Sequence, residues 1–547
     1  MHKINSPDQP LSTKLSRRGF MIGATSVGVT LAFMPAALLA SDPAQALSAN
    51  KFEPTIWYSI APSGQITVNV TKAEMGQHIG TAFARIVAEE LEADWADVQV
   101  NHVDTEAKYG LYVTGGSWSV WQNFDLMSRA GAAGRTALIE EGARLLGVAV
   151  GDCSAANSQV NCRGKSISYG DIVSQGNLSR SYTDAQLASL PIKAAKDRKL
   201  IGSETQALDI PSKTNGAAIY GIDATYEGMV YAKPIVPPTR YGSWVKSVDD
   251  SRAKNVKGYQ QTLVLKDPSN TVPGWALVIA DSFHAAQRAE RLITVEWDAG
   301  ATARVTEQDI LNRGAELIEG SSGSLVVEDG EVDATFVAAD SVLSQTYTTS
   351  TVLHFQLEPV NAIGLQKDGR WELHTGNQWQ SLILPTLAEA LEVPVEKVVM
   401  RTYLLGGGFG RRLNGDYGVP ALLAAKALGK PVKVVFSRED DSRFDSPRSA
   451  SVQKVSMAFD SAEKIVGMQH HATAGWPTSA MVPSFLGTGT NGEFYIVSVA
   501  GTTSLDGITN WGIGDWALFN GTVWQRVEGG ADGNFNNLTA NSLDVNG

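Results

Sequence analysis

The sequence predicts an α+β protein built from several domains. Three observations predict this class: the chain has 547 residues, more than one hydrophobic core usually organises; runs with strand and helix periodicity are mixed along it; and glycine-rich turns join many of these runs. With 43% hydrophobic and 19% charged residues, the composition is ordinary for a globular protein. The net charge of -12 and the lack of a basic stretch argue against a nucleic-acid partner.

Residues 1–46 predict an export signal. Arg17 and Arg18 precede an apolar run, and residues 44–46 end it with the small-residue pattern of a cleavage site. The adjacent arginines resemble the twin-arginine type, whose export machinery carries folded proteins, often with a cofactor inserted. A periplasmic enzyme with a large prosthetic group is therefore expected. A membrane-anchoring helix is the alternative, which Pro35 and the small residues disfavour.

Residues 50–200 predict a first unit of strands and helices. TIWYSIAPSGQITVNV predicts a hairpin around residues 62–64, and the apolar spacing after it predicts a helix that includes residues 79–91. VQVNHVD predicts a further strand. The glycines and alanines in the helical pattern of residues 125–146 predict close packing against another backbone.

Two further units are expected after a boundary near residues 180–210. Residues 205–305 alternate strand, helix and strand, which predicts a smaller α/β domain. Residues 306–491 follow a polar connection and predict strand, helix, strand, glycine loop, helix and strand.

The composition changes after about Gly492. Residues 493–547 contain no Lys, Pro, His or Cys and are rich in Gly, Asn, Thr and Trp. WALFNGTVWQRV predicts a hairpin, in which Asn520 and Gly521 suit a two-residue turn. A small β-rich tail is therefore expected.

Cysteine and histidine usage limits the cofactors. Cys153 and Cys162 are the only cysteines; an oxidising compartment permits their pairing, but their spacing does not establish it. Two cysteines exclude a four-cysteine iron–sulfur cluster held by this chain alone. The eight histidines form no H-x-x-x-H or HExxH pattern, so no protein-ligated metal site is expected.

The segment LLGGGFGRRL, residues 404–413, combines bare backbone with two arginines. Glycines let backbone N–H groups approach an anion, and phosphate is the natural ligand. Arg411 stands where the third glycine of G-x-G-x-x-G would be, and no G-K-[ST] follows, so the NAD-type and P-loop interpretations both fail. A glycine loop taken alone is more often only a tight turn.

Several loops of this kind occur in the chain: EMGQH, TGGSWS, TGNQW and GGGFGRR. Together with ADSFHAAQRAERLITVEWDAG and LEPVNA, they resemble the molybdenum-binding large subunit of the xanthine dehydrogenase and aldehyde oxidase family, in particular the isoquinoline 1-oxidoreductase β-subunit type. The resemblance covers residues 15 to about 491. It implies a truncated multidomain molybdopterin-binding fold, in which residues 50–200 and 306–491 bind the cofactor and residues 205–305 form a hammerhead-like domain.

The resemblance also implies a cofactor site. Molybdenum would be held by the dithiolene of a molybdopterin, as the cytosine dinucleotide, without a protein ligand to the metal. Gln378 would hydrogen-bond an oxygen on molybdenum; a surface amide is the alternative. Phe409 would pack against a flat substrate, and Arg411 would neutralise ligand charge, with an exposed salt bridge as its alternative. The backbone and polar groups expected to line the metal, the pterin and its phosphates are Gly76, Gln77, Gly116, Ser117, Gly407, Gly408 and Gly410. His78 and Trp118 stand where the larger enzymes of this family have glycine and arginine, respectively.

The implied reaction is oxidative hydroxylation of an aldehyde or an N-heterocycle. Two electrons would pass to molybdenum and then to a separate subunit with two [2Fe–2S] clusters, because this chain lacks cluster ligands.

The catalytic residue is missing from the sequence. The family uses a glutamate in a G-x-G-E segment as the base, and no G-x-G-E occurs in these residues. Residues 493–547 instead resemble phage tail-fibre proteins, so a chimera with a junction near residue 492 is expected, and an unfamiliar C-terminal domain is the alternative. The chain as written is expected to bind little molybdenum and to turn over no substrate. A tail-fibre or attachment component, or a noncatalytic exported protein, are the competing functions.

Overall fold

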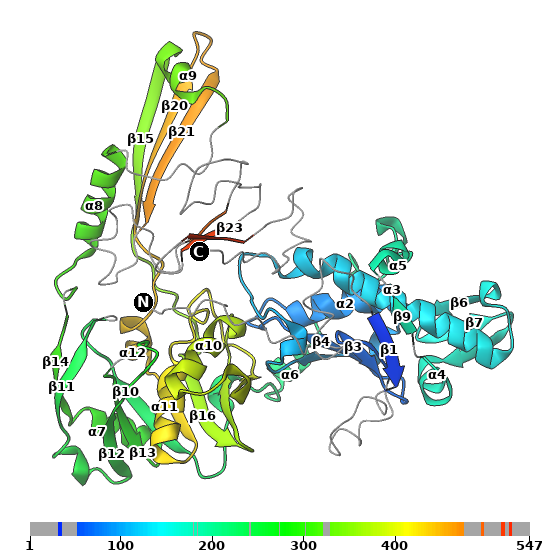
Figure 1. Ribbon diagram of the computed structural model, residues 1–547, viewed down its shortest axis with the longest axis horizontal. Helices are drawn as coiled ribbons and strands as arrows, with labels where there is room; N and C mark the ends of the chain where they lie inside the picture. The colour runs from blue at the N-terminus through cyan, green and yellow to red at the C-terminus, as the bar shows by residue number, and fades with distance from the viewer. Residues whose placement is uncertain are drawn as a thin grey trace.

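The computed structural model describes most of the chain between residues 52 and 474. Within that range residues 179, 183, 240, 241, 273, 301 and 321–328 are not described; outside it, the strands at 31–35, 494–496, 516–519 and 524–527 are. Helices and sheets are mixed throughout, as the predicted α+β class requires (Figure 1). Among the described residues no helix is both long and apolar enough to cross a bilayer.

A six-stranded sheet with two long helices forms the N-terminal lobe. Its strand order is β5-β4-β3-β2-β1-β9. The bounds are β1 Leu31–Pro35, β2 Phe52–Thr55, β3 Tyr58–Ile60, β4 Ile66–Val70, β5 Val98–His102 and β9 Arg180–Tyr182. β3 and β4 form the predicted hairpin, and β5 pairs parallel to β4 through a crossover that contains α2 (Ile79–Leu91). Alternate residues of β4 are buried, because one face of the sheet packs on the core.

The helix α3 (Ser119–Leu146) packs closely against α2, as its small residues predict. A Cβ atom at Gly131 would lie 2.8 Å from the carbonyl oxygen of Val87, and one at Gly134 would lie 1.7 Å from the Tyr58 hydroxyl. Glycine is therefore needed at both positions for the two helices and the sheet to meet. The helix begins six residues earlier than the sequence pattern indicates, at Ser119 instead of Asp125.

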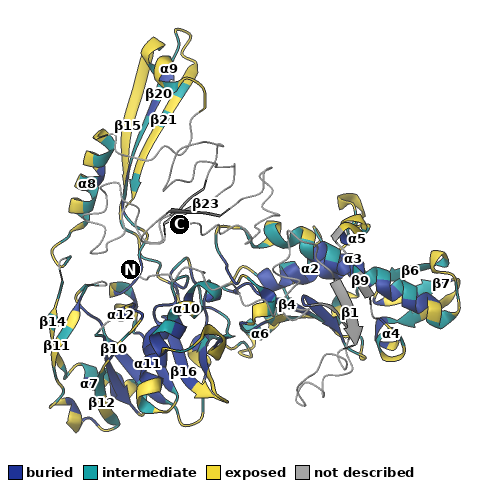
Figure 2. Ribbon diagram, in the orientation of Figure 1, coloured by how far each residue is buried: buried dark blue, intermediate teal, exposed yellow. Residues whose placement is uncertain are grey.

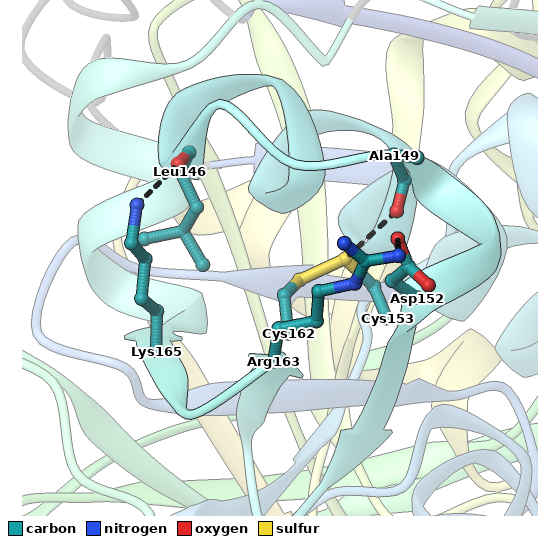
Figure 3. Close-up of a disulfide and its surroundings, with 7 residues drawn as sticks. All are labelled: Leu146, Ala149, Asp152, Cys153, Cys162, Arg163 and Lys165. Atoms are coloured by element: carbon teal, nitrogen blue, oxygen red, sulfur yellow. Dashed lines mark hydrogen bonds and ion pairs between the residues drawn. A yellow bond between two sulfur atoms is a disulfide. The ribbon is translucent and has the colours of Figure 1, made fainter.

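A small three-stranded sheet extends from the end of α3. It consists of β6 (Cys153–Ala156), β7 (Gln159–Cys162) and β8 (Lys165–Ser168). A disulfide joins Cys153 to Cys162 across the first pair of strands, which answers the question that their spacing left open (Figure 3). The short helices that follow are α4 (Tyr169–Gln175), α5 (Asp184–Ser189) and α6 (Ile210–Thr214).

A seven-stranded mixed sheet forms the second lobe, in the order β12-β13-β10-β19-β16-β17-β18. The bounds are β10 Val230–Ile235, β12 Tyr259–Val264, β13 Ala276–Ala280, β16 Asn361–Lys367, β17 Arg370–Thr375, β18 Val398–Thr402 and β19 Val432–Val435. The strands predicted for residues 205–305 and for residues 306–491 thus share one sheet, because β10 pairs with β19. Strand β14 (Thr294–Asp298) pairs instead with β11 (Trp244–Asp249).

Helices cover this sheet and complete its core. Helix α11 (Gly418–Leu428) is buried along most of its length and contacts β16, β17 and β19 (Figure 2). The other helices of the lobe are α7 (Phe283–Glu290), α10 (Gln380–Leu391) and α12 (Arg438–Arg443).

A long three-stranded sheet projects from the second lobe (Figure 1). It consists of β15 (Ser341–Thr349), β20 (Ser451–Phe459) and β21 (Ile465–Ala474), with α8 (Glu307–Glu319) and α9 (Val332–Ala338) against it. All residues of β15 are exposed (Figure 2).

The two chain ends contribute only strands to the described structure. β22 (Phe494–Ile496), β23 (Trp516–Phe519) and β24 (Trp524–Val527) form a three-stranded antiparallel sheet, as expected for a β-rich tail. Phe519 pairs with Trp524, and the predicted two-residue turn lies outside the described residues. β1 falls inside the predicted signal peptide and pairs with both β2 and β9.

Candidate functional site

The predicted cofactor loops meet at the junction of the two lobes. The EMGQH loop leads into α2, the TGGSW loop leads into α3, and the TGNQW and GGGFGRR loops follow β17 and β18. The amide of Leu405 donates to the carbonyl oxygen of Glu74 at 2.9 Å, and the amide of Ala73 donates to the Thr114 hydroxyl at 2.8 Å. The amide of Thr114 donates to the carbonyl oxygen of Gln378 at 2.7 Å. Segments hundreds of residues apart in sequence are thus hydrogen-bonded to each other.

Gln378 lies at the centre of this junction, and each of its polar groups joins two loops. Its side-chain Nε2 donates to the Thr114 carbonyl at 3.0 Å, and its Oε1 accepts from the amide of Gly410 at 3.1 Å. Its backbone N–H donates to the carbonyl of Arg412, while its carbonyl accepts from Thr114. The side chain is buried, so the surface-amide alternative is wrong. In this arrangement Gln378 holds the loops together.

The EMGQH loop is shaped by a carboxylate that sequence reasoning overlooked. Glu74 is buried, and its two oxygens accept hydrogen bonds from the amides of Gly76, His78 and Ile79. Gln77 bends its side chain back, donating to the Ala73 carbonyl and accepting from the Met75 amide. The start of α2 therefore receives its negative charge from Glu74, at the position where a ligand anion would otherwise bind.

Backbone N–H groups nevertheless remain available at the loop tips. Within the described part of the chain, no acceptor is found for the amides of Gln77, Gly116, Ser117, Gly407, Gly408 and Phe409. All of these were predicted site residues, and all but Gly408 are at least partly exposed. The amides of Gly410 and Arg411, in contrast, donate within the protein, to Gln378 Oε1 and to the carbonyl of Gly408.

Two glycines shape the tips of these loops. Gly116 has φ +59°, and a Cβ atom there would lie 2.7 Å from the ring of Trp118, which folds over it. A Cβ atom at Gly408 would lie 2.5 Å from Gln378 Oε1 and 2.9 Å from the sulfur of Met75. A side chain at Gly408 would separate the GGGFGRR loop from Gln378 and Met75, and one at Gly116 would displace the Trp118 ring.

Phe409 and Arg411 are adjacent in the loop but point to opposite environments. The Phe409 side chain is 72% exposed, with a backbone φ of 54° that is rare for a bulky residue. Arg411 is fully buried and pairs with Asp416 at 2.8 Å, with Asp441 and Asp445 at 3.5 and 3.4 Å. The alternative prediction, an exposed Arg411 in a salt bridge, is thus correct about the salt bridge and wrong about the exposure. The Arg411 charge is balanced by carboxylates inside the protein.

The buried carboxylates around Arg411 differ in their pKa values. Burial raises the pKa of Asp441. Burial would also raise the pKa of Asp445, but hydrogen bonds from the side chain and amide of His354 lower it on balance. Of these two carboxylates, Asp445 therefore keeps its negative charge more readily beside the Arg411 guanidinium, and Asp416 remains the nearest partner.

One cluster contains side chains of the types that ligate metals. Glu74, His78 and Asp209 bring ligand atoms within 4.8 Å of one another. However, the Lys213 ammonium lies 2.8 Å from Glu74 and 2.5 Å from Asp209. Burial tends to raise the pKa of Asp209, but hydrogen bonds from Lys213 and His78 lower it on balance. We interpret the cluster as an ion-pair network that ties α6 to the EMGQH loop.

A hollow of about 520 Å³ lies elsewhere in the second lobe. Tyr231, Phe283, Lys433 and Arg438 are among its lining residues, and none of the predicted site residues lines it. The candidate site is thus defined by converging loops.

The sequence analysis named residues at the tips of the loops. It did not name the residues that connect the loops to each other. Glu74, Thr114 and Lys72 connect the loops, but only contacts between distant segments give them these roles. The pairing of Glu74 with Lys213 spans 139 residues, and no local pattern marks it.

Comparisons with known proteins agree with the predicted family. A family model described as a molybdopterin cofactor-binding domain matches residues 318–500, and a second of the same description matches residues 9–205. The first extends past the predicted junction near residue 492, and the second extends into the predicted signal peptide.

Two curated relatives match along most of the chain. A membrane-bound aldehyde dehydrogenase (pyrroloquinoline-quinone) of Gluconacetobacter polyoxogenes is 55% identical over 497 residues, covering 88% of this chain and 63% of that protein. Isoquinoline 1-oxidoreductase subunit beta of Brevundimonas diminuta is 28% identical over 528 residues, covering 88% and 66%. The chain thus spans about two thirds of the length of these relatives. The tail-fibre alternative gains no support from them.

Among solved structures, CO dehydrogenase from Oligotropha carboxidovorans is similar, with 21% identity and a TM-score of 0.42 over 50% of this chain and 39% of that one.

The two domain models match on both sides of the loop junction, which confirms the predicted multidomain molybdopterin-binding fold. Both matched models describe a molybdopterin cofactor-binding domain, so the chain carries two segments of this domain type.

Proposed function

We propose that this chain is the cofactor-binding part of the large subunit of a molybdenum hydroxylase that oxidises aldehydes. The convergence of the EMGQH, TGGSW, TGNQW and GGGFGRR loops supports this proposal most directly, because amides without acceptors among the described residues lie at the tips of the EMGQH, TGGSW and GGGFGRR loops. The name of the 55% identical relative favours an aldehyde, and that of the 28% identical relative favours an N-heterocycle as the second candidate.

The residues at the loop tips fit an anionic organic cofactor, because exposed N–H groups from separate loops face it without protein acceptors. In this proposal Gln77 and Gly76 contact the pterin, and Gly116 and Ser117 contact phosphates of a cytosine dinucleotide form. Gly407, Gly408 and Gly410 line the metal end. The bound cofactor would supply oxygen transfer to the substrate and accept its two electrons. No side chain of the described loops is needed as a metal ligand.

Two side chains have roles of their own. Phe409 is held exposed beside these glycines, so its ring can stack on a flat substrate and orient it. Gln378 fixes the distance between the TGGSW and GGGFGRR loops. One N–H of its Nε2 group donates to Thr114, and the second N–H could make the predicted contact with the cofactor. Arg411 supports the loop from inside.

Electron transfer is proposed to use a separate iron–sulfur subunit with two [2Fe–2S] clusters. Both cysteines of this chain are joined in a disulfide, which leaves no thiolate ligand for a cluster. No G-x-G-E segment occurs among the 547 residues, so we propose that the chain by itself lacks turnover and holds molybdenum weakly.

Export to the periplasm is part of the proposal. The paired Arg17 and Arg18 and the disulfide both suit an oxidising compartment. N-terminal sequencing of the mature protein tests this: cleavage after Ala46 supports export and removes β1, whereas retention of residues 31–35 favours β1 as a permanent strand of the sheet.

Metal and pterin analysis tests the function. We expect substoichiometric molybdenum and no aldehyde-dependent dye reduction for the chain itself. Replacing residues 492–547 with the corresponding C-terminal part of the 55% identical relative should restore both. A correctly folded fusion without molybdenum, or one loaded with pyrroloquinoline quinone instead, would overturn the proposal.

A further inference from the structure

Lys72 is a buried lysine for which the fold provides no counter-ion. It directly precedes the EMGQH loop, its side chain is buried, and its Nζ donates to the carbonyl oxygen of Val113 at 3.1 Å. No carboxylate among the described residues pairs with it. Burial lowers its pKa to about 8, so the ammonium form predominates at neutral pH.

Other buried lysines show how this fold usually treats such a charge. Lys233 pairs with Asp440, and the half-buried Lys213 pairs with Glu74 and Asp209. Lys433 resembles Lys72 more closely, because its Nζ donates only to backbone carbonyls, those of Ile222 and Ala224. However, Lys433 lies in β19 of the second lobe, and Asp223 and Glu358 exert electrostatic effects on it. Among the described residues next to the candidate site, Lys72 is therefore a buried lysine without a carboxylate partner, whereas Arg411 and Arg412 each pair with a carboxylate.

The position of Lys72 connects two of the loops that carry unpaired amides. Lys72 bonds to Val113, and the next residue, Ala73, bonds to Thr114, so both hold the extended loop segment that leads directly to Gly116 and Ser117. The Gly116 and Ser117 amides have no acceptor among the described residues. The Lys72 ammonium is thus hydrogen-bonded to the TGGSW segment at Val113, three residues before the first of these N–H donors.

We propose that Lys72 supplies the positive charge for binding a phosphate or pyrophosphate group at the Gly116 and Ser117 amides. The proposal rests on the proposed function, in which that group belongs to the cofactor. An ammonium removed from water, with a single neutral acceptor, gains most from an anion in its neighbourhood, because Coulomb attraction is strong where the dielectric constant is low. A lysine that only supported the Val113 carbonyl would not need its charge.

Inorganic pyrophosphate serves as the probe, with sulfate at equal ionic strength as the control for nonspecific binding. Isothermal titration compares the unaltered chain with Lys72→Met, Lys72→Arg and the matched control Lys433→Met. We expect pyrophosphate binding to the unaltered chain and to Lys433→Met with equal Kd, a Kd within about threefold for Lys72→Arg, and a Kd at least tenfold higher for Lys72→Met. Circular dichroism and unfolding curves verify that each variant is folded.

Equal binding by Lys72→Met and the unaltered chain would overturn the proposal, as would a response to pyrophosphate no larger than that to sulfate. If Lys72→Met fails to fold, loss of binding in a folded Lys72→Gln variant supports the proposal, and retained binding contradicts it. Failure of the proposed function gives a different result: Lys72-dependent pyrophosphate binding would persist while the restored fusion carries no molybdenum. A fusion that loads equal molybdenum with and without Lys72→Met would contradict only the role of Lys72.

Discussion

The two arginines of the GGGFGRR loop and Lys72 are all buried cations near the candidate site, but the fold treats them differently. Arg411 pairs with Asp416, and Arg412 pairs with Glu358 at 3.0 Å and donates to the carbonyls of Gly376 and Glu358. Lys72 has one neutral carbonyl. The charges of Arg411 and Arg412, which the sequence shows beside the glycines, are therefore used to stabilise the protein. The charge of Lys72, which no motif marks, has no carboxylate partner and can attract a ligand. Sequence proximity of glycine and arginine does not by itself locate an anion site.

The largest effect expected from this comparison is on stability. Arg412→Met should lower the free energy of unfolding by about 3–5 kcal/mol, because it leaves the buried Glu358 carboxylate without its cation. Lys72→Met should change it by less than about 1 kcal/mol, since losing the bond to Val113 is offset by removing a desolvated charge. Urea unfolding followed by tryptophan fluorescence measures both. Equal losses in the two variants would contradict the comparison.

A smaller loss of stability is expected at Gln378. Gln378→Leu leaves the Thr114 carbonyl and the Gly410 amide without their partners and should cost about 1–3 kcal/mol. Gln77→Leu is the matched control, because the Gln77 side chain is exposed and bonds only within its own loop. The same unfolding measurement applies. If the Gln77 variant is the less stable of the two, Gln378 is not the residue that joins the loops.

The smallest predicted effect is a pH dependence of anion binding. Burial lowers the pKa of Lys72 to about 8 in the free protein, so the cation is present below that pH and is lost as pH rises through it. The Kd for pyrophosphate should therefore rise by up to about tenfold per pH unit above 8. Two other titratable groups near this segment do not meet the ammonium: His102 contacts the Lys72 carbonyl, and Glu74 pairs with Lys213. Lys72→Arg should remove this dependence, and an unchanged profile in that variant would assign it to another group.

Local patterns were sufficient for much of the fold and for the loop tips. The β3–β4 hairpin, α2, and the close packing of Gly131 and Gly134 follow from periodicity and residue size. The joining of β10 to β19 in one sheet could not be predicted in this way, because strand pairing across 200 residues depends on tertiary packing.

The site shows the same division. Gly116 and Gly408 were predicted as site residues from the resemblance to the family, and the structure places them where a side chain would clash with Trp118 or Gln378. The burial of Arg411 could not be predicted, since its partner Asp441 lies on α12, and the lack of a counter-ion at Lys72 becomes visible only once every neighbour is placed. Whether a buried charge such as Arg411 or Lys72 has a counter-ion depends on which distant residues the fold places beside it.

The central claim is that separate loops bind one ligand. Hydrogen–deuterium exchange tests it most directly, with and without added molybdopterin cofactor, in the fusion that carries the C-terminal part of the 55% identical relative. The account predicts that amides at residues 76–78, 115–118 and 407–410 become protected together, with the hairpin of β6 and β7 unchanged as an internal reference. Protection limited to one of these segments, or absent from all of them, would contradict it.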